Sequence, residues 1–507
     1  MAVSSAEQPK LATGALGLGA QLFQSITHMA PVAGIVFSVQ YMASQGGASL
    51  TLAYILATIA CTLTALCLKE LVRKVRSPGG YFVIHSVALG HFAGFTTSWM
   101  YFIYDPLIPA SAALLWGAMT QDFLATYVGI SIPWWVFTII MASVLTFVSY
   151  VGVRQSARVT MVLGTIETVV FGLLGLILIL KAGSHQPVTS LSPVSSPNAF
   201  GGVLFAMIYG ILSFIGFEAG VPLSEESYNA KRSLMIAIMA SCVGIGLFYC
   251  FMAYGTVAGW GNFDDPSAFA GDFGDASKPV FYILATRAFG AIGPLIMWLL
   301  ITNSLYAVGV AGTNAVTRVY FSLGRAGVFP KALGLVNPTT RTPANAILLQ
   351  GVISLGMAFV AGFAFGVEPL VAYGLIGLLM TIGAVIVYMM TNLSCVALYT
   401  GPYKREFNVF NHLVIPILAT IVFIPPLVAS LYPRALDLIQ PGLGFDNTYP
   451  VSLALPICII WAIIGLAIYF YLRATRPQAL DVMANEMARV ELVGEEEDPT
   501  SRAVLVR

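Results

Sequence analysis

Runs of apolar residues about twenty long follow one another along almost the whole 507-residue chain. A helix of about 20 apolar residues crosses the hydrocarbon core of a bilayer while satisfying its own backbone polar groups. Hydrophobic residues make up 58% of the chain and charged residues only 9%, and the mean hydropathy is +0.85. A soluble domain carries roughly 25% charged residues, so this chain could not cover its surface in water. The sequence therefore predicts an all-α membrane protein.

The apolar runs predict about twelve transmembrane helices. They cover residues 18–43, 48–71, 92–119, 131–150, 157–181, 200–224, 233–257, 288–318, 343–364, 368–398, 411–432 and 450–472. Segments 81–91 and 275–287 are expected to lie on the surface beside the membrane helices. Segments 182–199 and 259–280 are rich in Ser, Pro, Gly or Asp and are expected to be external loops.

Basic residues are concentrated in alternate connections between the predicted helices. They are Lys69, Arg73, Lys74, Arg76, Arg154, Arg158, Lys231, Arg232, Arg318, Arg325, Lys331, Arg341, Lys404, Arg405, Arg473 and Arg476. By the positive-inside rule these connections are cytoplasmic, which places both termini on the cytoplasmic side of the plasma or inner membrane. The stretch from Met1 to Gly14 lacks the features of a cleaved signal peptide.

The predicted first and sixth helices are both interrupted near their middles. Pro31 lacks a backbone N–H and clashes with the preceding turn, so helix one should kink or unwind there. Helix six carries Gly216 and the acidic Glu218. A matched pair of interrupted helices in the two halves of a chain is typical of inverted-repeat transporters with a site near the bilayer midplane. The simpler interpretation is that Pro and Gly merely shape these helices. The matched spacing favours the transporter.

Four ionisable side chains lie at membrane depth within the predicted spans, away from the span ends: His28, Asp105, Glu167 and Glu218. Each costs about 2.5–3.5 kcal/mol on insertion scales, so each is a candidate functional group. Lys and Arg are almost absent from the middles of the spans, so the acids are either protonated or visited by a cation. Both states suit proton or cation coupling. The simpler alternative is a protonated carboxyl that bonds a backbone carbonyl, and Pro106 frees such a group beside Asp105.

Other classes of protein are disfavoured. The chain has no metal-ligand spacing, nucleotide-binding loop or nucleophile motif, so neither an enzyme, nor a resident cofactor or metal, is expected. A channel would need a continuous polar stripe or a ring of charge. The bilayer is the expected partner, and no nucleic acid is expected. The six cysteines lie within apolar spans and are expected to be packing thiols: Cys61, Cys67, Cys242, Cys250, Cys395 and Cys458.

Four predicted cytoplasmic segments carry short motifs, each weak alone, whose order and spacing along the chain together are specific for one family. They are Glu70, Leu71 and 76–81; Gly152 to Arg154, Ser156 and Ala157; Phe214 to Ala219, Glu225, Glu226, Asn229, Lys231 and Arg232; and Arg318, 324–327, Pro330, Thr342 and Pro343. Together they resemble the amino acid–polyamine–organocation (APC) family of secondary carriers. Two positions depart from the family pattern, because Ala230 replaces a usual Pro and Ala326 replaces a usual acid.

The resemblance implies a LeuT-like fold, a 5+5 inverted repeat plus two C-terminal helices. The expected parts are a cytoplasmic tail (1–17), a first repeat (18–181), an external loop (182–199), a second repeat (200–398), the last two helices (399–472) and a second cytoplasmic tail (473–507). The resemblance also implies alternating access to a solute held between the unwound parts of helices one and six. The substrate-binding residues expected there are Thr27, His28, Ala30, Val32, Ala33, Gly34, Ser213, Phe214, Ile215, Gly216 and Phe217.

Coupling is assigned to Glu167, Glu218 and His28. When the chain is compared with this family, Glu167 falls where many members carry a Lys. The resemblance implies that this Lys takes the place of a bound cation in proton-coupled members. A Glu reverses the sign, so it could carry a proton itself or help hold a cation. The break in helix one offers fewer glycine amides than the family pattern, with Val32 and Ala33 before Gly34.

The sequence thus predicts a secondary active transporter of an amino acid or related amine. Protons are the expected coupling ion, with sodium as the alternative. A polyamine carrier, an amino acid exchanger and a nutrient receptor that kept the fold but lost transport remain as other hypotheses. The sequence does not indicate an oligomeric state.

Overall fold

The computed structural model describes residues 16–75, 79–325, 327 and 329–475, and all regular elements within these ranges are helices. In this described part, nine helices are long and apolar enough to cross a membrane, and a bent helix pair makes a tenth span. The nine are built on α4 (Leu50–Val72), α8 (Trp134–Val151), α9 (Val153–Ala182), α11 (Ala230–Trp260), α14 (Gly293–Arg325), α15 (Ala344–Phe363), α16 (Pro369–Thr400), α17 (Ile415–Leu431) and α18 (Ala454–Thr475). The spans of α14, α17 and α18 also include the short helices before them and begin at Val280, Phe410 and Val451. The protein is an all-α membrane protein, as predicted.

The remaining predicted spans, numbers one, three and six, are divided into shorter helices. They consist of α1 (Leu18–Met29), α2 (Pro31–Val36) and α3 (Val39–Gly46); of α6 (His91–Tyr101) and α7 (Leu107–Phe123); and of α10 (Ala199–Leu212) followed by the short helix η4 (Val221–Glu226). The path of helix one bends by 51° where α3 begins. The interruptions of helices one and six agree with the prediction, whereas the one in helix three was not predicted. The total of twelve spans stays a prediction.

Three short helices occupy the connections: α5 (Tyr81–Leu89), α12 (Pro266–Phe273) and α13 (Val280–Phe289). The expectation that segment 81–91 lies on the surface is wrong for its first half, because residues 81–86 are buried against α6 and α16. These six residues are mostly apolar or aromatic, so burial in protein is favourable for them.

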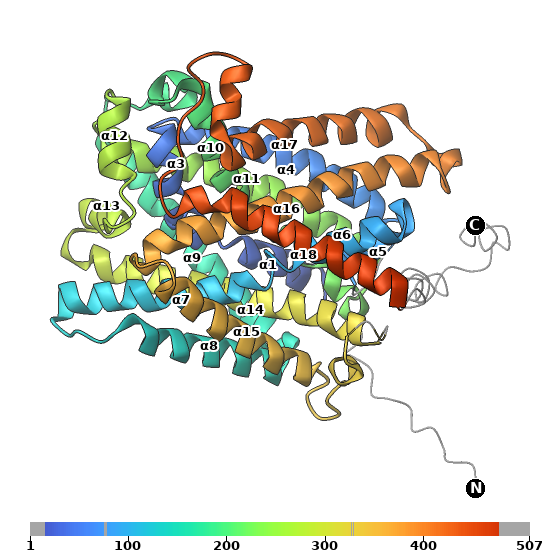
Figure 1. Ribbon diagram of the computed structural model, residues 1–507. Helices are drawn as coiled ribbons and strands as arrows, with labels where there is room; N and C mark the ends of the chain where they lie inside the picture. Colours follow the sequence, from blue (N-terminus) through green and yellow to red (C-terminus); the bar gives the residue numbers. More distant parts are fainter. Residues whose placement is uncertain (1–15, 76–78, 326, 328, 476–507) are drawn as a thin grey trace, which may run out of the picture.

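The long helices form two groups with α1 between them. In one group α7, α8, α14 and α15 pack on one another, and in the other α4 packs on α10 and α11, while α10 packs on α3. Figure 1 shows α8, α14 and α15 at the bottom, α3, α4 and α10 at the top, and α1 in the middle. Because α1 contacts both α11 and α14, it touches both groups.

The basic connections meet at one end of the bundle, which we call the basic end. There Lys74 Nζ lies 2.6 Å from Glu406 Oε1, and Arg318 Nε lies 2.9 Å from Glu226 Oε1. The opposite end, which we call the loop end, carries residues 183–198 with α12 and α13. In Figure 1 the loop end is on the left and α5, near the basic end, is on the right.

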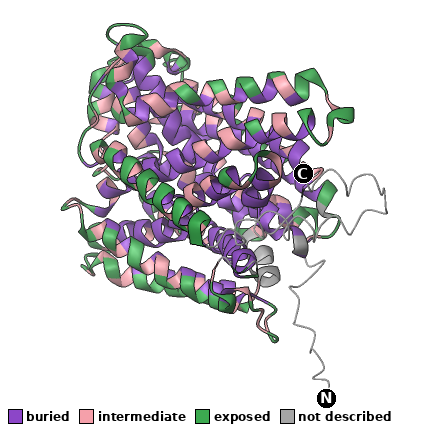
Figure 2. Ribbon diagram, turned by 45° about the vertical axis from the view of Figure 1, so that its right-hand side comes forward, coloured by how far each residue is buried: buried purple, intermediate pink, exposed green. Residues whose placement is uncertain are grey.

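The outer surface of the bundle is apolar. Phe147, Leu180 and Val352 are 67%, 69% and 72% exposed, which in water would be unfavourable for side chains of this size. Figure 2 shows buried residues through the interior and exposed residues along peripheral helices, including α18. The apolar exterior fits contact with lipid. All six cysteines are free.

Some sequence predictions concern features that the described structure leaves untested. The inverted repeat and its boundaries stay predictions. Of the predicted tails, residues 1–15 and 476–507 lie outside the described residues. So do residues 76–78 and Ala326 of the four family-like segments.

Candidate functional site

Helix one is broken at Ala30. The residue adopts a left-handed conformation (φ 51°, ψ 79°) that ends α1, and Pro31 then begins α2. Proline suits the first position of a helix because its missing N–H would have no partner there. A non-glycine residue with positive φ carries backbone strain, which persists where the surrounding structure holds it in place.

Helix six is broken over residues 213–220, and Gly216 at its centre has a φ of 118°. A Cβ added to Gly216 would lie 2.6 Å from Cδ2 of His28. The breaks in helices one and six therefore touch, at His28 and Gly216. A side chain larger than hydrogen could not occupy this position without displacing the imidazole.

Two main-chain amides after the break in helix one are bonded by side chains from other helices. The Val32 N–H donates to Glu167 Oε1 (3.2 Å), and the Ala33 N–H donates to Ser304 Oγ (3.0 Å). Glu167 also accepts a hydrogen bond from Asn303 Nδ2 at 2.6 Å. Glu167 is 2% exposed, so its carboxyl is a buried cap on α2. These bonds join helix one to α9 and α14.

Carbonyl groups at the breaks are bonded by hydroxyls. The Ser213 hydroxyl donates to Gly34 O at 2.7 Å, and the Tyr54 hydroxyl lies 3.2 Å from the same oxygen. The Tyr249 hydroxyl lies within hydrogen-bonding distance of both Met29 O (2.5 Å) and Ser213 O (2.9 Å). These contacts tie helix one to helix six and satisfy carbonyls that broken helices leave without helical partners.

A cavity lies between the broken helices, and we call it the central cavity. Its lining residues are His28, Met29, Ala30, Ala33, Gly34, Phe37, Ser38, Ile108, Ser111, Ala112, Leu115, Leu212, Ser213, Ile215, Leu305, Val308, Tyr373 and Met380. It is mostly apolar, with a few hydroxyl and main-chain groups, as is usual for sites that bind small solutes.

Six of the predicted substrate-binding residues line the central cavity: His28, Ala30, Ala33, Gly34, Ser213 and Ile215. The other five lie outside this lining. Thr27 donates to Phe23 O (2.6 Å), and Val32 is fully buried. Phe214 packs edge-on against Tyr249, Phe217 packs against Tyr388, and Gly216 contacts His28.

Sequence reasoning missed the contribution of helices three, eight and ten to the central cavity. Ser111 lies on α7, Leu305 on α14 and Tyr373 on α16. The Tyr373 ring packs edge-on against Phe37 with centroids 6.1 Å apart. Single apolar or hydroxyl residues within apolar runs carry no sequence signal, because only tertiary packing brings them to the cavity.

Two further cavities continue the line of the central cavity. The loop-end cavity shares Phe37 with it and reaches Lys278 and Pro279. The basic-end cavity shares His28 with it and reaches Gly80 and Pro222. Three cavities thus follow one another from the loop end to the basic end, with Phe37 and His28 at the two junctions.

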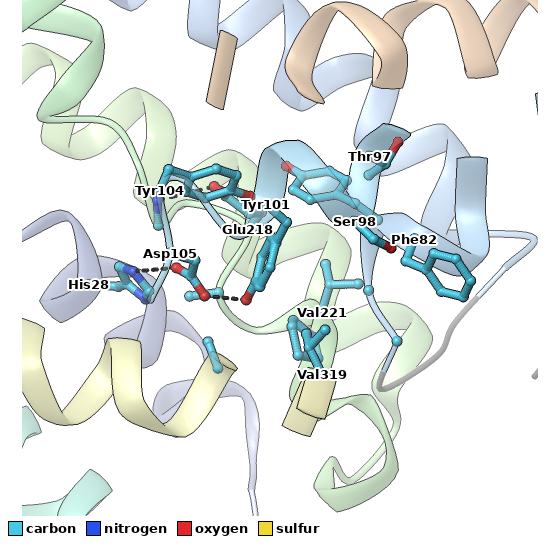
Figure 3. A pocket seen from close by; sticks show the side chains of 17 residues that line it. His28, Phe82, Thr97, Ser98, Tyr101, Tyr104, Asp105, Glu218, Val221 and Val319 are labelled. Carbon is cyan, nitrogen blue, oxygen red and sulfur yellow. Dashed lines mark hydrogen bonds and ion pairs between the residues drawn. The ribbon is translucent and has the colours of Figure 1, made fainter. Parts of the chain in front are cut away.

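Asp105 and Glu218 lie on the basic-end side of this line. Asp105, 3% exposed, sits in the break of helix three, where Oδ1 lies 3.4 Å from His28 Nε2 and Oδ2 accepts a hydrogen bond from Tyr101. Glu218 accepts bonds from the Gly216 N–H (3.1 Å) and the Tyr388 hydroxyl (3.1 Å). Figure 3 shows Asp105 between His28 and Tyr101.

The three coupling candidates therefore fall into two places. Glu167 faces the amides of helix one from α9, while His28 and Glu218 lie at the basic-end cavity with Asp105. Among the described residues, no group of three or more His, Cys, Asp or Glu could hold a metal ion.

Comparison with known proteins places this architecture in a family. Residues 21–481 match the family model for amino acid permeases. The low-affinity putrescine importer PlaP of Escherichia coli (strain K12) is 28% identical over 372 residues, covering 71% of this chain and 75% of that protein. The branched-chain amino acid permease BcaP of Bacillus subtilis (strain 168) is 25% identical over 327 residues, covering 61% and 66%. The gamma-aminobutyric acid permease of Escherichia coli (strain K12) is 24% identical over 357 residues, covering 68% and 72%.

The matched region contains the breaks of helices one, three and six and the lining residues of the three cavities described above. The family and the relatives are transporters and not enzymes. This chain belongs to the amino acid permease family.

Proposed function

We propose that this protein carries an amino acid or related amine across the plasma or inner membrane, driven by protons that bind Glu167. The observation that carries the coupling step is the bridge made by the Glu167 carboxyl between the Val32 N–H on helix one and the Asn303 amide on α14. The amino acid, putrescine and gamma-aminobutyric acid permeases among the relatives support the solute class.

The central cavity is the proposed binding place of the solute. It lies where the breaks in helices one and six meet, and both its hydroxyls and its main-chain groups can bond polar ends of a small solute. Ser38 and Ser213 bond each other (3.1 Å) on its wall. A carrier needs such adaptable groups, because the solute must be released after it is bound.

Protonation of Glu167 changes what its oxygens can do. An ionised carboxylate only accepts, and here it accepts from two N–H groups. In a protonated carboxyl one oxygen donates and is a poorer acceptor, so the hydrogen bond from one of these N–H groups weakens. Complete loss of that acceptor would cost about 1–3 kcal/mol, which is the upper bound for this weakening. Proton binding therefore loosens the attachment of helix one to α9 or α14.

This loosening would couple the proton to alternating access. Helix one contacts both helix groups, and the side chains at the cavity junctions, Phe37 and His28, both belong to helix one. A shift of helix one relative to α14 would move both junctions at once. The solute could then reach one end of the bundle while the other end stays closed.

The proposal is tested by uptake into proteoliposomes. Purified protein is first screened by thermal shift against amino acids and amines, and hits are tested as labelled solutes under an imposed pH gradient, a sodium gradient or no gradient. The pH gradient should drive accumulation at least several-fold above the no-gradient level. Glu167→Gln should abolish this gain, whereas Glu368→Gln, an exposed acid at the start of α16, should not.

Other outcomes would overturn the coupling step. Accumulation that follows the sodium gradient, or that keeps its pH dependence in Glu167→Gln, contradicts proton coupling through Glu167. Solute binding without uptake under every gradient would indicate a receptor. Uptake only against a solute loaded inside the vesicles would indicate an exchanger.

A further inference from the structure

The basic-end cavity contains polar side chains that the coupling mechanism does not use. It is lined from helices one, three and six, from α5 and from α14, and Figure 3 shows the residues around it. The hydroxyls of Tyr81, Ser98 and Tyr104 are buried on this lining, and none has a hydrogen-bond partner within the described protein. These residues are 6%, 8% and 1% exposed. Nδ1 of His28, which is 3% exposed, also lacks a partner.

Buried polar atoms without partners are rare in folded proteins, because each loses its hydrogen bonds to water without replacement. Four such atoms around one cavity form a set of groups able to bind a polar ligand. Tyr81 lies on α5, Ser98 and Tyr104 lie in helix three and His28 lies on α1, so the four atoms come from three separate helices.

The charge of this cavity is acidic. Asp105 and Glu218 both line it, and His28 is the one basic side chain among its described lining residues. His28 Nε2 lies 3.4 Å from Asp105 Oδ1. Glu218 accepts hydrogen bonds from the Gly216 amide and the Tyr388 hydroxyl, and neither group carries a positive charge. When both carboxyls are ionised, they outnumber the one imidazole, and a cationic ligand would balance the negative charge.

The walls of the cavity are also aromatic. The rings of Tyr101 and Tyr104 meet edge to face with centroids 5.0 Å apart, and Tyr81 stands edge-on to Tyr388 at 6.4 Å. Aromatic faces attract cations, and this attraction grows when the site is shielded from water. Carboxylates, hydroxyl oxygens and aromatic rings together suit an organic ammonium group, which is a compact cation with several N–H donors.

We propose that the basic-end cavity is a second solute site, which binds a primary organic ammonium group next to Asp105. In this position the ammonium replaces the imidazole of His28 as the partner of Asp105. The solute would thereby open the junction that His28 forms between the central and basic-end cavities. The inference rests on the proposed function in one respect, since the ammonium belongs to the carried solute.

The site is tested by titration calorimetry on the purified full-length protein in detergent. The probes are n-butylammonium chloride and neutral butyramide, which is similar in size. We expect n-butylammonium to bind more tightly than butyramide. Asp105→Asn should weaken n-butylammonium about tenfold or more, because it removes the charge from one charge-assisted hydrogen bond. Butyramide should change by less than about twofold.

Two further variants sharpen the test. Tyr104→Phe removes only a hydroxyl and should weaken n-butylammonium about threefold, the size of one modest hydrogen bond. If the Asp105→Asn protein aggregates and cannot be titrated, the affinity of Tyr104→Phe for n-butylammonium provides the test of the site. Asp264→Asn removes an equal charge from an exposed position at the loop end and should leave the affinity unchanged.

The site is contradicted if the wild type does not prefer n-butylammonium to butyramide, which would mean that the cavity is only hydrated. It is also contradicted if neither Asp105→Asn nor Tyr104→Phe weakens n-butylammonium. An equal loss of both probes in Asp105→Asn would assign Asp105 a structural role. Because binding is measured without a gradient, these outcomes are separate from a failure of proton-driven uptake.

Discussion

Gly216 lies with its Cα against the imidazole of His28, at the point where the broken helices meet. Its φ of 118° is a conformation that L side chains rarely adopt, and a Cβ would lie 2.6 Å from the ring. Both backbone and space therefore require glycine here. Any side chain would move His28, which lines two cavities and faces Asp105.

We predict that Gly216→Ala abolishes solute accumulation and lowers the melting temperature of the purified protein. Strained backbone alone costs on the order of 1–3 kcal/mol, and displacement of His28 adds to it. The control is Gly244→Ala on α11, where an added Cβ meets nothing within 4 Å. That change should leave transport intact and be neutral or slightly stabilising, because alanine favours a helix by roughly 0.5–1 kcal/mol. Full activity of Gly216→Ala would contradict the arrangement.

At the residue scale, Glu167 could be found from sequence because an acid in an apolar run is conspicuous. Its partners could not be found, since Val32 and Asn303 are 135 and 136 residues away along the chain. Phe37 and Tyr373 are likewise ordinary apolar-run residues until packing places them at the central cavity.

At the element scale, the two predicted helix breaks came from backbone chemistry that is local. Pro31 and Gly216 mark the breaks because each residue limits or widens the accessible backbone conformations. The break of helix three carried a signal as well, since Pro106 directly precedes α7. Within an apolar run a proline is also compatible with a continuous, kinked helix, so the sequence alone does not predict that helix three ends before Pro106.

The ion pair between Glu226 and Arg318 joins η4 to α14 at the basic end. Both residues belong to the family-like segments, and they are 1% and 0% exposed. Removing one member of a buried pair leaves the other charge without a partner, which costs on the order of 3–5 kcal/mol.

Glu226→Gln should therefore lower the melting temperature by several degrees, and the double variant Glu226→Gln with Arg318→Gln should regain part of the loss. As a control, Asp446→Asn breaks an exposed pair with Arg434 at the loop end and should have little effect. Thermal unfolding of the purified protein followed by fluorescence measures all three. Equal melting temperatures for Glu226→Gln and the wild type would show that the pair does not hold these elements together.

At the scale of the whole molecule, the apolar runs predicted the membrane class because the bilayer imposes both length and composition on a spanning helix. They could not predict the line of three cavities, which depends on how two helix groups pack around helix one. The connections at the two ends of the bundle differ in their content of Lys and Arg, and that difference makes the orientation testable.

The basic end should face the cytoplasm. A single cysteine at Lys404, in the exposed connection after α16, should react with a membrane-impermeant maleimide only in permeabilised cells. One at Asp264, whose side chain is 71% exposed at the loop end, should react in intact cells. The unsubstituted protein reports the background from its six native thiols. Labelling of the cysteine at position 404 in intact cells would show that the basic end faces outward, opposite to the prediction.

The central claim is that a proton on Glu167 crosses the membrane together with the solute. It is tested most directly by a pH dye inside proteoliposomes, with the solute added outside and no other gradient imposed. The account predicts that the solute acidifies the interior in the wild type and in Glu368→Gln, and that Glu167→Gln gives no acidification while still binding the solute. Solute-dependent acidification of equal size in Glu167→Gln would contradict the account.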